Sequence, residues 1–221
     1  MKRILVIDIG GTHVKLMISR KKKRKFDSGK KLTPRELVAQ IKKSTDDWDF
    51  DAISLGFPSP VENGRILKDP KHLGKGWIRF DFKKALRKPM RIINDAAMQA
   101  LGSYSGKRML FLGLGTGLGS TLIWGNNILP LELGDLPYPG VERIEDVVGK
   151  IGFDRLGRKA WQKETLDIVQ KLKISFIADY VVLGGGNVKQ MERLPRGIQR
   201  GSNRNAYLGG CRLWQPRWNI L

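Results

Sequence analysis

Residues 4–18 read ILVIDIGGTHVKLMI, which is two short apolar runs on either side of a glycine pair. An apolar run that ends in glycines and resumes a few residues later is typical of a β-hairpin closed by a tight turn. We therefore predict strands at residues 4–7 and 14–18, joined by a turn that contains Gly10 and Gly11.

The turn of this hairpin carries groups that can bind a phosphate. Gly10 and Gly11 have no Cβ, so backbone N–H groups can approach an anion closely, and Thr12 adds a hydroxyl donor. Lys15 can supply a positive charge, and Asp8 can hold Mg²⁺ through water, because this ion dehydrates reluctantly. The alternative is a plain hairpin whose glycines serve only a positive φ.

The same order of elements returns in the second half of the chain. Residues 109–114 are apolar, Gly115, Thr116 and Gly117 form the next glycine turn, and residues 120–124 are the predicted return strand. The segment lacks the Gly-Lys-Ser/Thr end of a Walker loop and the glycine spacing of a dinucleotide-binding turn. Two Gly/Thr turns that face each other across a cleft would clamp a polyanion from both sides.

A third glycine cluster follows a buried strand that we predict at residues 180–183. Gly184, Gly185 and Gly186 expose bare backbone, against which a flat base or a phosphate chain can lie. Any one of the three clusters can be purely structural, whereas all three in this order favour the binding of a phosphoryl donor.

The remaining pattern predicts an α/β chain of two lobes. Thr33 caps a helix, with a proline in the first turn. Further strands are predicted at residues 52–57 and 91–93, and further helices at residues 96–104 and within 144–173. The lobes are expected at residues 1–104 and 105–221, with a hinge near residues 102–107 and with residues 203–221 returning to the first lobe.

The chain of 221 residues has 41 basic and 21 acidic residues, which gives a net charge of +20. Such a charge concentrates anionic partners such as nucleotides, polyphosphate or nucleic acid. A nucleic-acid reader motif or a row of stacking aromatic residues is not recognisable in the sequence. The other explanation of the net charge is that solubility or a hot habitat favoured basic residues. The densest basic cluster, residues 21–25, is either a solvated hairpin tip or a binding site.

The lone Cys211 excludes a disulfide within this chain, and two histidines provide no zinc site of the usual spacing. No apolar run approaches the roughly 18 residues of a membrane helix. Asp8 also interrupts the stretch that would be apolar in a signal peptide. We therefore expect a cytoplasmic protein that binds neither membrane nor zinc.

The motifs, in their order, resemble those of the ROK family of sugar kinases, and within it those of the polyphosphate glucokinases. The matching phosphate, sugar, catalytic, adenosine and closing-helix motifs are residues 8–12, 55–58, 64–66, 73–77, 94–96, 112–120, 132–134, 183–186 and 205–209. The resemblance implies a two-lobed α/β fold of the actin-like ATPase (ribonuclease H-like) type with a central cleft. It is also compatible with a homodimer.

The resemblance assigns Asp95 as the base that takes the proton from the sugar hydroxyl. A carboxylate at a strand end, beside the N-terminus of a helix, is held in place for this task. Asn94 is implied to bind a sugar hydroxyl, although it can equally be a simple helix cap. Glu132 is implied to accept hydrogen bonds from two sugar hydroxyls.

Two positions depart from the family pattern. Asp135 stands where the family's Glu-x-Gly-His motif has histidine, and Ser59 follows Pro58 where Pro-Gly is usual. Because a carboxylate only accepts hydrogen bonds, the contact of Asp135 with the sugar is expected to differ from that of the family's histidine. The resemblance also places Pro58 and Ser59 at the sugar. Asp135 can also be a solvent-facing loop acid. The family's cysteine-rich zinc loop is missing, as in polyphosphate glucokinases.

Together these motifs predict a kinase that uses Mg²⁺ and transfers a terminal phosphoryl group from polyphosphate or ATP to a hexose hydroxyl. Glucose is the expected acceptor. One alternative is a sugar-binding regulator of the same family, but such regulators carry a DNA-binding helix-turn-helix ahead of the kinase fold, and here the phosphate hairpin starts at Ile4. The other alternative is a nucleic-acid-binding protein that acts through its basic surface.

Overall fold

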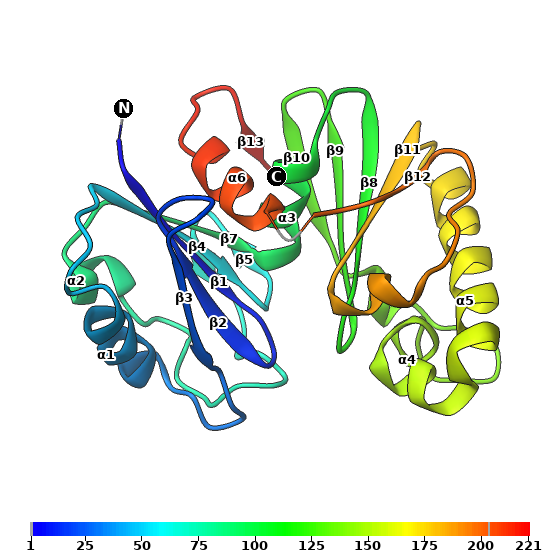
Figure 1. The fold of residues 1–221 in the computed structure, drawn as a ribbon, viewed down its shortest axis with the longest axis horizontal. Helices are drawn as coiled ribbons and strands as arrows, with labels where there is room; N and C mark the ends of the chain where they lie inside the picture. Colours follow the sequence, from blue (N-terminus) through cyan, green and yellow to red (C-terminus); the bar gives the residue numbers. More distant parts are fainter. Residues whose placement is uncertain (1, 203) are drawn as a thin grey trace. The chain divides into compact units, whose positions relative to one another are not determined.

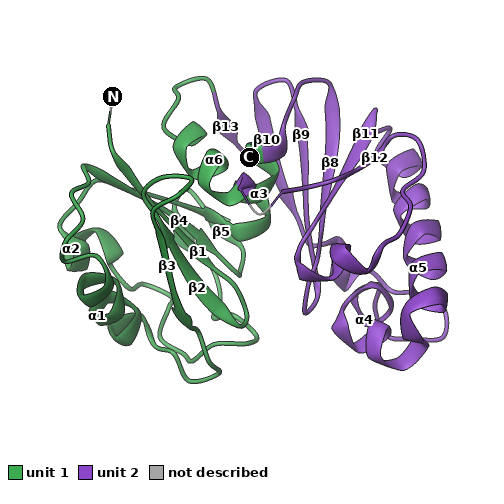
Figure 2. Cartoon of the chain, viewed as in Figure 1, with its two compact units in different colours: residues 1–102, 206–217 green, residues 103–205, 218–221 purple. Residues whose placement is uncertain are grey.

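The computed structural model describes residues 2–202 and 204–221 of the chain. These residues form two compact units, each a sheet that carries helices, which Figure 2 distinguishes by colour. The segments are Met1–Gly102 and Ala206–Arg217 in unit 1, and Ser103–Asn205 and Trp218–Leu221 in unit 2.

Unit 1 contains a mixed sheet, a short separate hairpin and helices (Figure 1). Its strands are β1 (Ile4–Ile9), β2 (His13–Met17), β3 (Lys23–Asp27), β4 (Ala52–Phe57), β5 (Val61–Glu62), β6 (Arg65–Ile66) and β7 (Met90–Asn94). Its helices are α1 (Pro34–Ser44), α2 (Phe82–Leu86), α3 (Asp95–Ser103) and α6 (Asn205–Arg212). The strand order in the main sheet is β3-β2-β1-β4-β7.

The predicted hairpin is confirmed, because β1 pairs antiparallel with β2, and Asp8 lies opposite Lys15. On its other side β1 pairs in parallel with β4, and β4 with β7. Every residue of β1 and of β4 is buried. This pattern is expected of parallel strands in the middle of a sheet whose two faces are both covered.

Each face of this sheet has its own helices. Leu5 and Ile7 of β1 point to the face where they share a core with residues of α1 and α2. Val6 points to the opposite face and meets α6 at Gly210, where a Cβ would collide with the valine side chain. On the same face, the Ser54 hydroxyl donates a hydrogen bond of 2.7 Å to the carbonyl oxygen of Gly210.

Helix α1 begins as the sequence predicts. The Thr33 hydroxyl accepts a hydrogen bond from the Glu36 N–H, and the Glu36 carboxylate accepts one of 2.8 Å from the Thr33 N–H. This capping box satisfies backbone donors that the first turn of a helix cannot satisfy itself. Leu37, Val38 and Ile41 form the buried side of the helix.

The basic cluster at residues 21–25 covers the exposed end of the β2–β3 hairpin and the start of β3, so the prediction of a solvated hairpin tip holds in part. Lys23, Arg24 and Lys25 are the exposed start of edge strand β3. Arg24 binds both carboxylate oxygens of Asp47, at 2.6 and 2.8 Å. An exposed edge strand that carries charges resists pairing with another chain, which gives the cluster a structural use.

Unit 2 is built on a second mixed sheet. Its strands are β8 (Arg108–Leu114), β9 (Leu118–Trp124), β10 (Asn127–Leu131), β11 (Tyr180–Gly184), β12 (Ile198–Arg200) and β13 (Asn219–Ile220). Its helices are the 3₁₀-helices η1 (Leu133–Asp135) and η2 (Gly186–Gln190), and α4 (Glu145–Val148) and α5 (Lys150–Ser175). The strand order is β12-β11-β8-β9-β10-β13.

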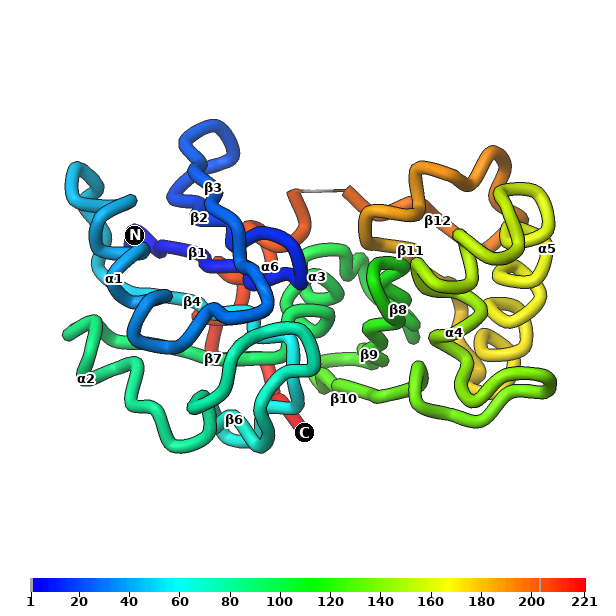
Figure 3. The backbone as a smooth tube through the Cα atoms, turned by 90° about the horizontal axis from the view of Figure 1, so that it is seen from below, coloured from blue at the N-terminus to red at the C-terminus, as the bar shows by residue number. Residues whose placement is uncertain are grey.

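Helix α5 lies along one face of this sheet, as Figures 1 and 3 both show. Its residues Trp161 and Ile168 share a core with Leu112 of β8 and Leu183 of β11. The prediction of helices over residues 144–173 is confirmed by α4 and α5, and within α5 Gly157 has φ 72° and interrupts the helix. A positive φ is sterically easy for glycine alone.

The C-terminal segment is divided between the units. Of residues 203–221, Ala206–Arg217 belongs to unit 1, whereas Trp218–Leu221 belongs to unit 2, where β13 pairs with β10. Residue 203 lies outside the described residues. Among the described helices, none has the length and apolar character needed to cross a membrane.

Candidate functional site

The predicted site residues are divided between the two units. In unit 1, the parallel strands β1, β4 and β7 end at Ile9, Phe57 and Asn94. Because the carboxyl ends of parallel strands meet at the same edge of a sheet, the residues that follow lie along that edge. The predicted residues gathered there are Asp8, Gly10, Gly11, Thr12, Lys15, Pro58, Ser59, Asn94 and Asp95.

Asp8 is a buried carboxylate near the end of β1. Its side chain is 3% exposed, and its Oδ2 lies 3.1 Å from the Nζ of Lys15. Its Oδ1 is buried and accepts no hydrogen bond from any described residue. A buried carboxylate oxygen without a donor is costly, so a cation or a water held by a cation would satisfy it.

The geometry around Asp8 fits Mg²⁺ rather than a metal held by many side chains. In the described part of the chain, no three His, Cys, Asp or Glu residues are grouped so that they could hold a metal ion. Mg²⁺ is usually bound through one or two carboxylates, several waters and the phosphates of a substrate. Asp8 with its unsatisfied oxygen can provide the carboxylate.

Asn94 and Asp95 lie where β7 passes into α3. The Ala97 N–H donates to Asn94 Oδ1 at 3.1 Å, so Asn94 does act as a cap of this helix. The Ala96 N–H donates to Asp95 Oδ1 at 2.8 Å, which orients that carboxylate. The side-chain NH₂ of Asn94 remains chemically able to donate to a hydroxyl.

Gly56 of β4 allows α3 to approach the sheet, a role that we did not predict from the sequence. A Cβ on Gly56 would lie 3.3 Å from the Cα of Asp95 and would collide with the side chain of Met98. Gly56 is also the register partner of Asp8 on β1. A single glycine therefore sets the distance between Asp8 and the start of α3.

We call residues 10–12 the first turn. The Gly10 N–H donates to the His13 carbonyl at 3.0 Å, and the Thr12 carbonyl accepts from the Ser28 N–H at 3.0 Å. Gly11 and Thr12 are exposed. Gly10 does not lie at a positive φ, and a Cβ there would be 3.3 Å from the His13 oxygen. The turn therefore tolerates a Cβ at Gly10 with only a small adjustment.

Ser59 has a structural partner at the loop after β4. Its side chain is buried, and its hydroxyl donates to the Lys68 carbonyl oxygen at 2.8 Å. Pro58 directly precedes it at the end of the strand. This bond fixes the loop that is expected to face the sugar.

We call residues 115–117 the second turn, and it joins β8 to β9 in unit 2. The Gly115 N–H donates to the Gly117 carbonyl at 3.1 Å. The Thr116 carbonyl accepts from the Lys150 N–H at 3.2 Å, and the Gly115 carbonyl accepts from the side chain of Asn187 at 2.9 Å. Neighbouring elements α5 and η2 therefore brace this turn.

Gly117 of the second turn is a packing glycine. A Cβ there would collide with Oε2 of Glu145, while its φ is not in the left-handed region. The alternative that the glycines of the first turn serve only a positive φ does not hold for Gly10, and Gly115 and Gly117 of the second turn do not lie at a positive φ either. At Gly117 the backbone is ordinary, and the constraint comes from a side chain remote in sequence.

Glu132 precedes η1, and we call residues 132–135 the η1 segment. The Ser120 hydroxyl donates to the Leu131 carbonyl at 2.8 Å and accepts from the Leu133 N–H at 3.0 Å. These two bonds fix the backbone on both sides of Glu132. Sequence reasoning missed this role of Ser120, although a serine within a strand that is expected to be buried is a usable signal for such a bond.

Asp135 is partnered by Arg143, which sequence reasoning also missed. Arg143 lies 3.4 Å from Asp135, 2.8 Å from Glu145 and 3.4 Å from Asp146. Glu145 contributes most to raising the pKa of Arg143, and the guanidinium stays charged. The acid-rich stretch around Arg143 is the sequence signal that could have indicated this cluster.

Gly184 ends β11, and Gly185 follows with φ 84°. A Cβ on Gly185 would collide with the backbone of Leu114, so this glycine is required by the close approach of two strands. The next residue, Gly186, begins η2 and has no atom within 4 Å of a would-be Cβ. Of the third cluster, Gly186 has the most open surroundings.

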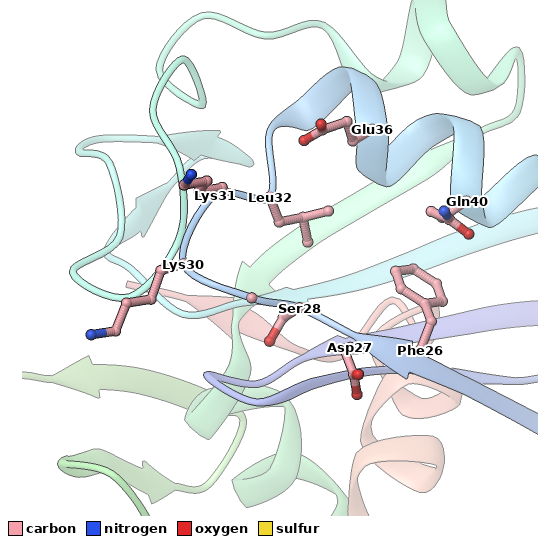
Figure 4. Close-up of a pocket in the computed structure, with 9 residues that line it drawn as sticks. Phe26, Asp27, Ser28, Lys30, Lys31, Leu32, Glu36 and Gln40 are labelled. Atoms are coloured by element: carbon pink, nitrogen blue, oxygen red, sulfur yellow. The ribbon is translucent and has the colours of Figure 1, made fainter.

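Among the described residues, a pocket of about 550 Å³ lies in unit 1 between β3 and α1. Figure 4 shows its lining, which includes Phe26, Leu32 and Glu36. None of the predicted site residues lines it. Its Glu36 is already engaged in the capping box of α1.

The sequence matches the ROK family over residues 4–130. The chain belongs to the ROK family. This ROK protein is similar to the glucokinase of Pyrobaculum calidifontis, with 26% identity over 125 residues, which are 54% of this chain and 42% of that protein. The match thus spans less than half of the relative's length.

Solved structures show the fold of this ROK protein. The inorganic polyphosphate/ATP-glucomannokinase of Arthrobacter sp. strain KM superposes with a TM-score of 0.80 and 21% identity, covering 95% of this chain and 97% of that one. A ROK family glucokinase of Streptomyces griseus in complex with glucose and AMPPNP gives a TM-score of 0.73 and 15% identity, covering 95% and 98%. The family resemblance and the actin-like ATPase type of α/β fold are confirmed.

Proposed function

We propose that this ROK protein is a sugar kinase that transfers a terminal phosphoryl group from polyphosphate or ATP to a hexose hydroxyl, with glucose as the acceptor. The observation that carries the proposal is the edge of the unit 1 sheet. Asp8, on β1, is a buried carboxylate with one unsatisfied oxygen. Asp95, the first residue of α3, is an oriented carboxylate directly after β7, and β4 separates β7 from β1 in the sheet. Catalysis of phosphoryl transfer is largely positioning and charge stabilisation, which such fixed groups provide.

Asp95 would take the proton of the attacking hydroxyl. Its Oδ1 is oriented by the Ala96 N–H, and its position at the first residue of α3 holds the carboxylate at the sheet edge. A carboxylate within hydrogen-bond reach of a hydroxyl aims the oxygen and accepts its proton as the bond to phosphorus forms. Asn94 would donate its side-chain NH₂ to a second sugar hydroxyl while its oxygen caps α3.

The two turns would hold the phosphoryl donor. Both present glycine backbone and a threonine hydroxyl, Thr12 in the first turn and Thr116 in the second, and both threonines are exposed. Backbone N–H groups and hydroxyls are the donors that bind phosphate oxygens without steric obstruction. Gly184, Gly185 and the open Gly186 are the candidates for contact with the rest of the donor, whether adenosine or further phosphates.

Asp8 would hold Mg²⁺ through water, with Lys15 keeping the carboxylate in place. When bound there, Mg²⁺ would neutralise the charge that develops on the phosphate oxygens. Glu132, fixed between two hydrogen bonds of Ser120, would accept hydrogen bonds from sugar hydroxyls.

The relatives support both donors. One solved relative is named a polyphosphate/ATP-glucomannokinase, and another is named a glucokinase and holds glucose and AMPPNP. The net charge of +20 adds a physical reason for polyphosphate, because a long polyanion gains more from a basic surface than a nucleotide does.

The experiment is a coupled assay for glucose 6-phosphate with ATP or long-chain polyphosphate, repeated over a panel of hexoses and with EDTA. We expect turnover with glucose, loss of turnover when EDTA removes Mg²⁺, and recovery when Mg²⁺ is restored. Sugar binding by calorimetry without turnover on any hexose would indicate the regulator class instead. Failure to bind any sugar or donor would refute the proposal.

A further inference from the structure

We propose that Arg143 is a positioning residue, which holds the second turn and the η1 segment together so that donor and sugar contacts form at the same time. The inference rests on the proposed function and names a residue that the family motifs do not include. Three observations carry it: a steric one, an electrostatic one and the use of Asp135.

The steric observation is that Glu145 fills the space left by two glycines. A Cβ on Gly117 of the second turn would collide with Oε2 of Glu145, and a Cβ on Gly134 of the η1 segment would lie 3.3 Å from the Cβ of Glu145. A third glycine, Gly149, would place its Cβ 2.7 Å from the carbonyl oxygen of Thr116. Both segments therefore pack directly on Glu145, and whatever fixes Glu145 fixes them.

Arg143 holds the Glu145 side chain through an ion pair. Its Nη1 lies 2.8 Å from Glu145 Oε1, while the Arg143 N–H donates to Asp146 Oδ2 at 3.0 Å. The side chains are 30% exposed for Arg143 and 18% for Glu145, so the pair is partly shielded from water. Partly buried pairs are screened by salt much less than exposed ones.

Asp135 extends this arrangement to the η1 segment. Its Oδ1 lies 3.4 Å from Arg143 Nη1, three residues after Glu132. With the Ser120 hydroxyl holding the backbone before and after Glu132, the ion pair fixes the other end of the segment. The acid at position 135 thus has a use that does not require contact with the sugar.

The electrostatic observation concerns the charge beside the second turn. Arg143 neutralises part of a cluster of three carboxylates, those of Asp135, Glu145 and Asp146, and Glu145 touches the turn. Without the guanidinium, these carboxylates would repel an anionic donor across a short distance. Arg143 therefore serves donor binding twice, by holding Glu145 and by cancelling its charge.

The experiment measures KM for glucose and for long-chain polyphosphate, together with kcat, in Arg143→Met at about 50 mM and about 500 mM salt. We expect both KM values to rise about tenfold or more while kcat changes less, because the loss is one of positioning. The ratio of the variant's polyphosphate KM to that of the parent should shrink at high salt, since salt screens the repulsion between polyphosphate and Asp135, which is the most exposed of the three carboxylates at 37%.

Two further variants and a control separate positioning from stability. Arg143→Lys keeps the charge, so its KM for polyphosphate should lie close to that of the parent. Glu145→Gln should raise both KM values severalfold. Because it removes a carboxylate, its ratio of variant to parent KM for polyphosphate should be the same at low and at high salt. Arg24→Met is the matched control. Arg24 lies on β3 in unit 1, and its guanidinium binds both carboxylate oxygens of Asp47, so this variant also removes an arginine from an ion pair. It should leave both KM values unchanged.

The outcomes distinguish this inference from the proposed function. If the parent protein turns over glucose and folded Arg143→Met keeps both KM values within about twofold, the inference is wrong and the kinase proposal stands. If Arg143→Met does not fold, the KM values of Arg143→Lys and Glu145→Gln test the inference instead, and KM values within about twofold of the parent in Glu145→Gln would refute it. If the parent shows no turnover, calorimetric titration with glucose and with polyphosphate replaces KM, and equal affinities in parent and variant refute the inference.

Discussion

The first and second turns both combine glycines with a threonine between two paired strands, but their surroundings differ. The first turn is held by the hairpin itself and by one bond to Ser28, with Gly11 and Thr12 exposed. The second turn is braced by Lys150, Asn187 and the side chain of Glu145. A Cβ at Gly10 would therefore lie close to a backbone oxygen only, whereas a side chain at Gly117 would have to displace the end of the Glu145 side chain.

A glycine substitution therefore does not test the two turns equally. A side chain at Gly10 meets one backbone oxygen at 3.3 Å, while a side chain at Gly117 meets a carboxylate in an ion pair. A loss of donor binding after substitution of Gly117 therefore combines a local repacking with any direct phosphate contact. The predictions below separate these effects, beginning with the largest.

The largest effect is expected at the unit 1 edge, where Asp95→Asn should lower kcat by about 10²- to 10⁴-fold. Asparagine keeps the shape and can still accept the Ala96 N–H, so the fold and the KM for glucose should change little. Steady-state kinetics and a glucose titration measure both quantities. A kcat within tenfold of the parent would remove Asp95 from the role of base.

The second prediction concerns the packing glycine of the second turn. Gly117→Val should lower the free energy of unfolding by about 1–3 kcal/mol and raise the donor KM at least tenfold, because the added atoms displace Glu145. Chemical denaturation and donor titration are the measurements, with Gly10→Ala as the control in the first turn. Equal stability of Gly117→Val and the parent would mean that the turn accommodates the side chain.

The third prediction compares the two turns through their hydroxyls. Thr12→Val and Thr116→Val remove one hydrogen-bond donor each without changing the size of an exposed side chain much. Each should raise the donor KM by about three- to tenfold, the effect of losing one hydrogen bond with a net contribution of about 0.5–1.5 kcal/mol. If only one of the two variants raises the donor KM, the turn that carries it binds phosphate and the other turn is purely structural.

The smallest expected effect is a difference in salt dependence between donors. The KM for long-chain polyphosphate should rise severalfold more steeply with salt than the KM for ATP, because more charges are paired along the longer anion. The excess of 41 basic over 21 acidic residues motivates this expectation. Parallel salt curves for the two donors would leave the basic surface without a role in donor binding.

Local patterns sufficed for the elements that depend on neighbours in sequence. The hairpin at Gly10, the cap of α1 at Thr33 and the cap of α3 at Asn94 each follow from residues a few positions apart. Turn formation and capping are short-range effects of backbone geometry, so a single sequence determines them. The ROK family was likewise identified from motifs that are contiguous in the chain.

The reasons behind those motifs came only from the tertiary structure. Gly56 is needed because α3 lies against β4, Gly185 because β8 lies beside β11, and Gly117 because Glu145 packs on the second turn. Arg143 acquires its role only when Asp135 and Glu145 are folded around it. The sequence by itself determined the central strands, the glycine turns and the capped helices, since those depend on local forces, whereas the strands β3, β10, β12 and β13 were not predicted. Which atoms share the space beside a glycine or a charge depends on packing between distant segments, and only the folded chain decides it.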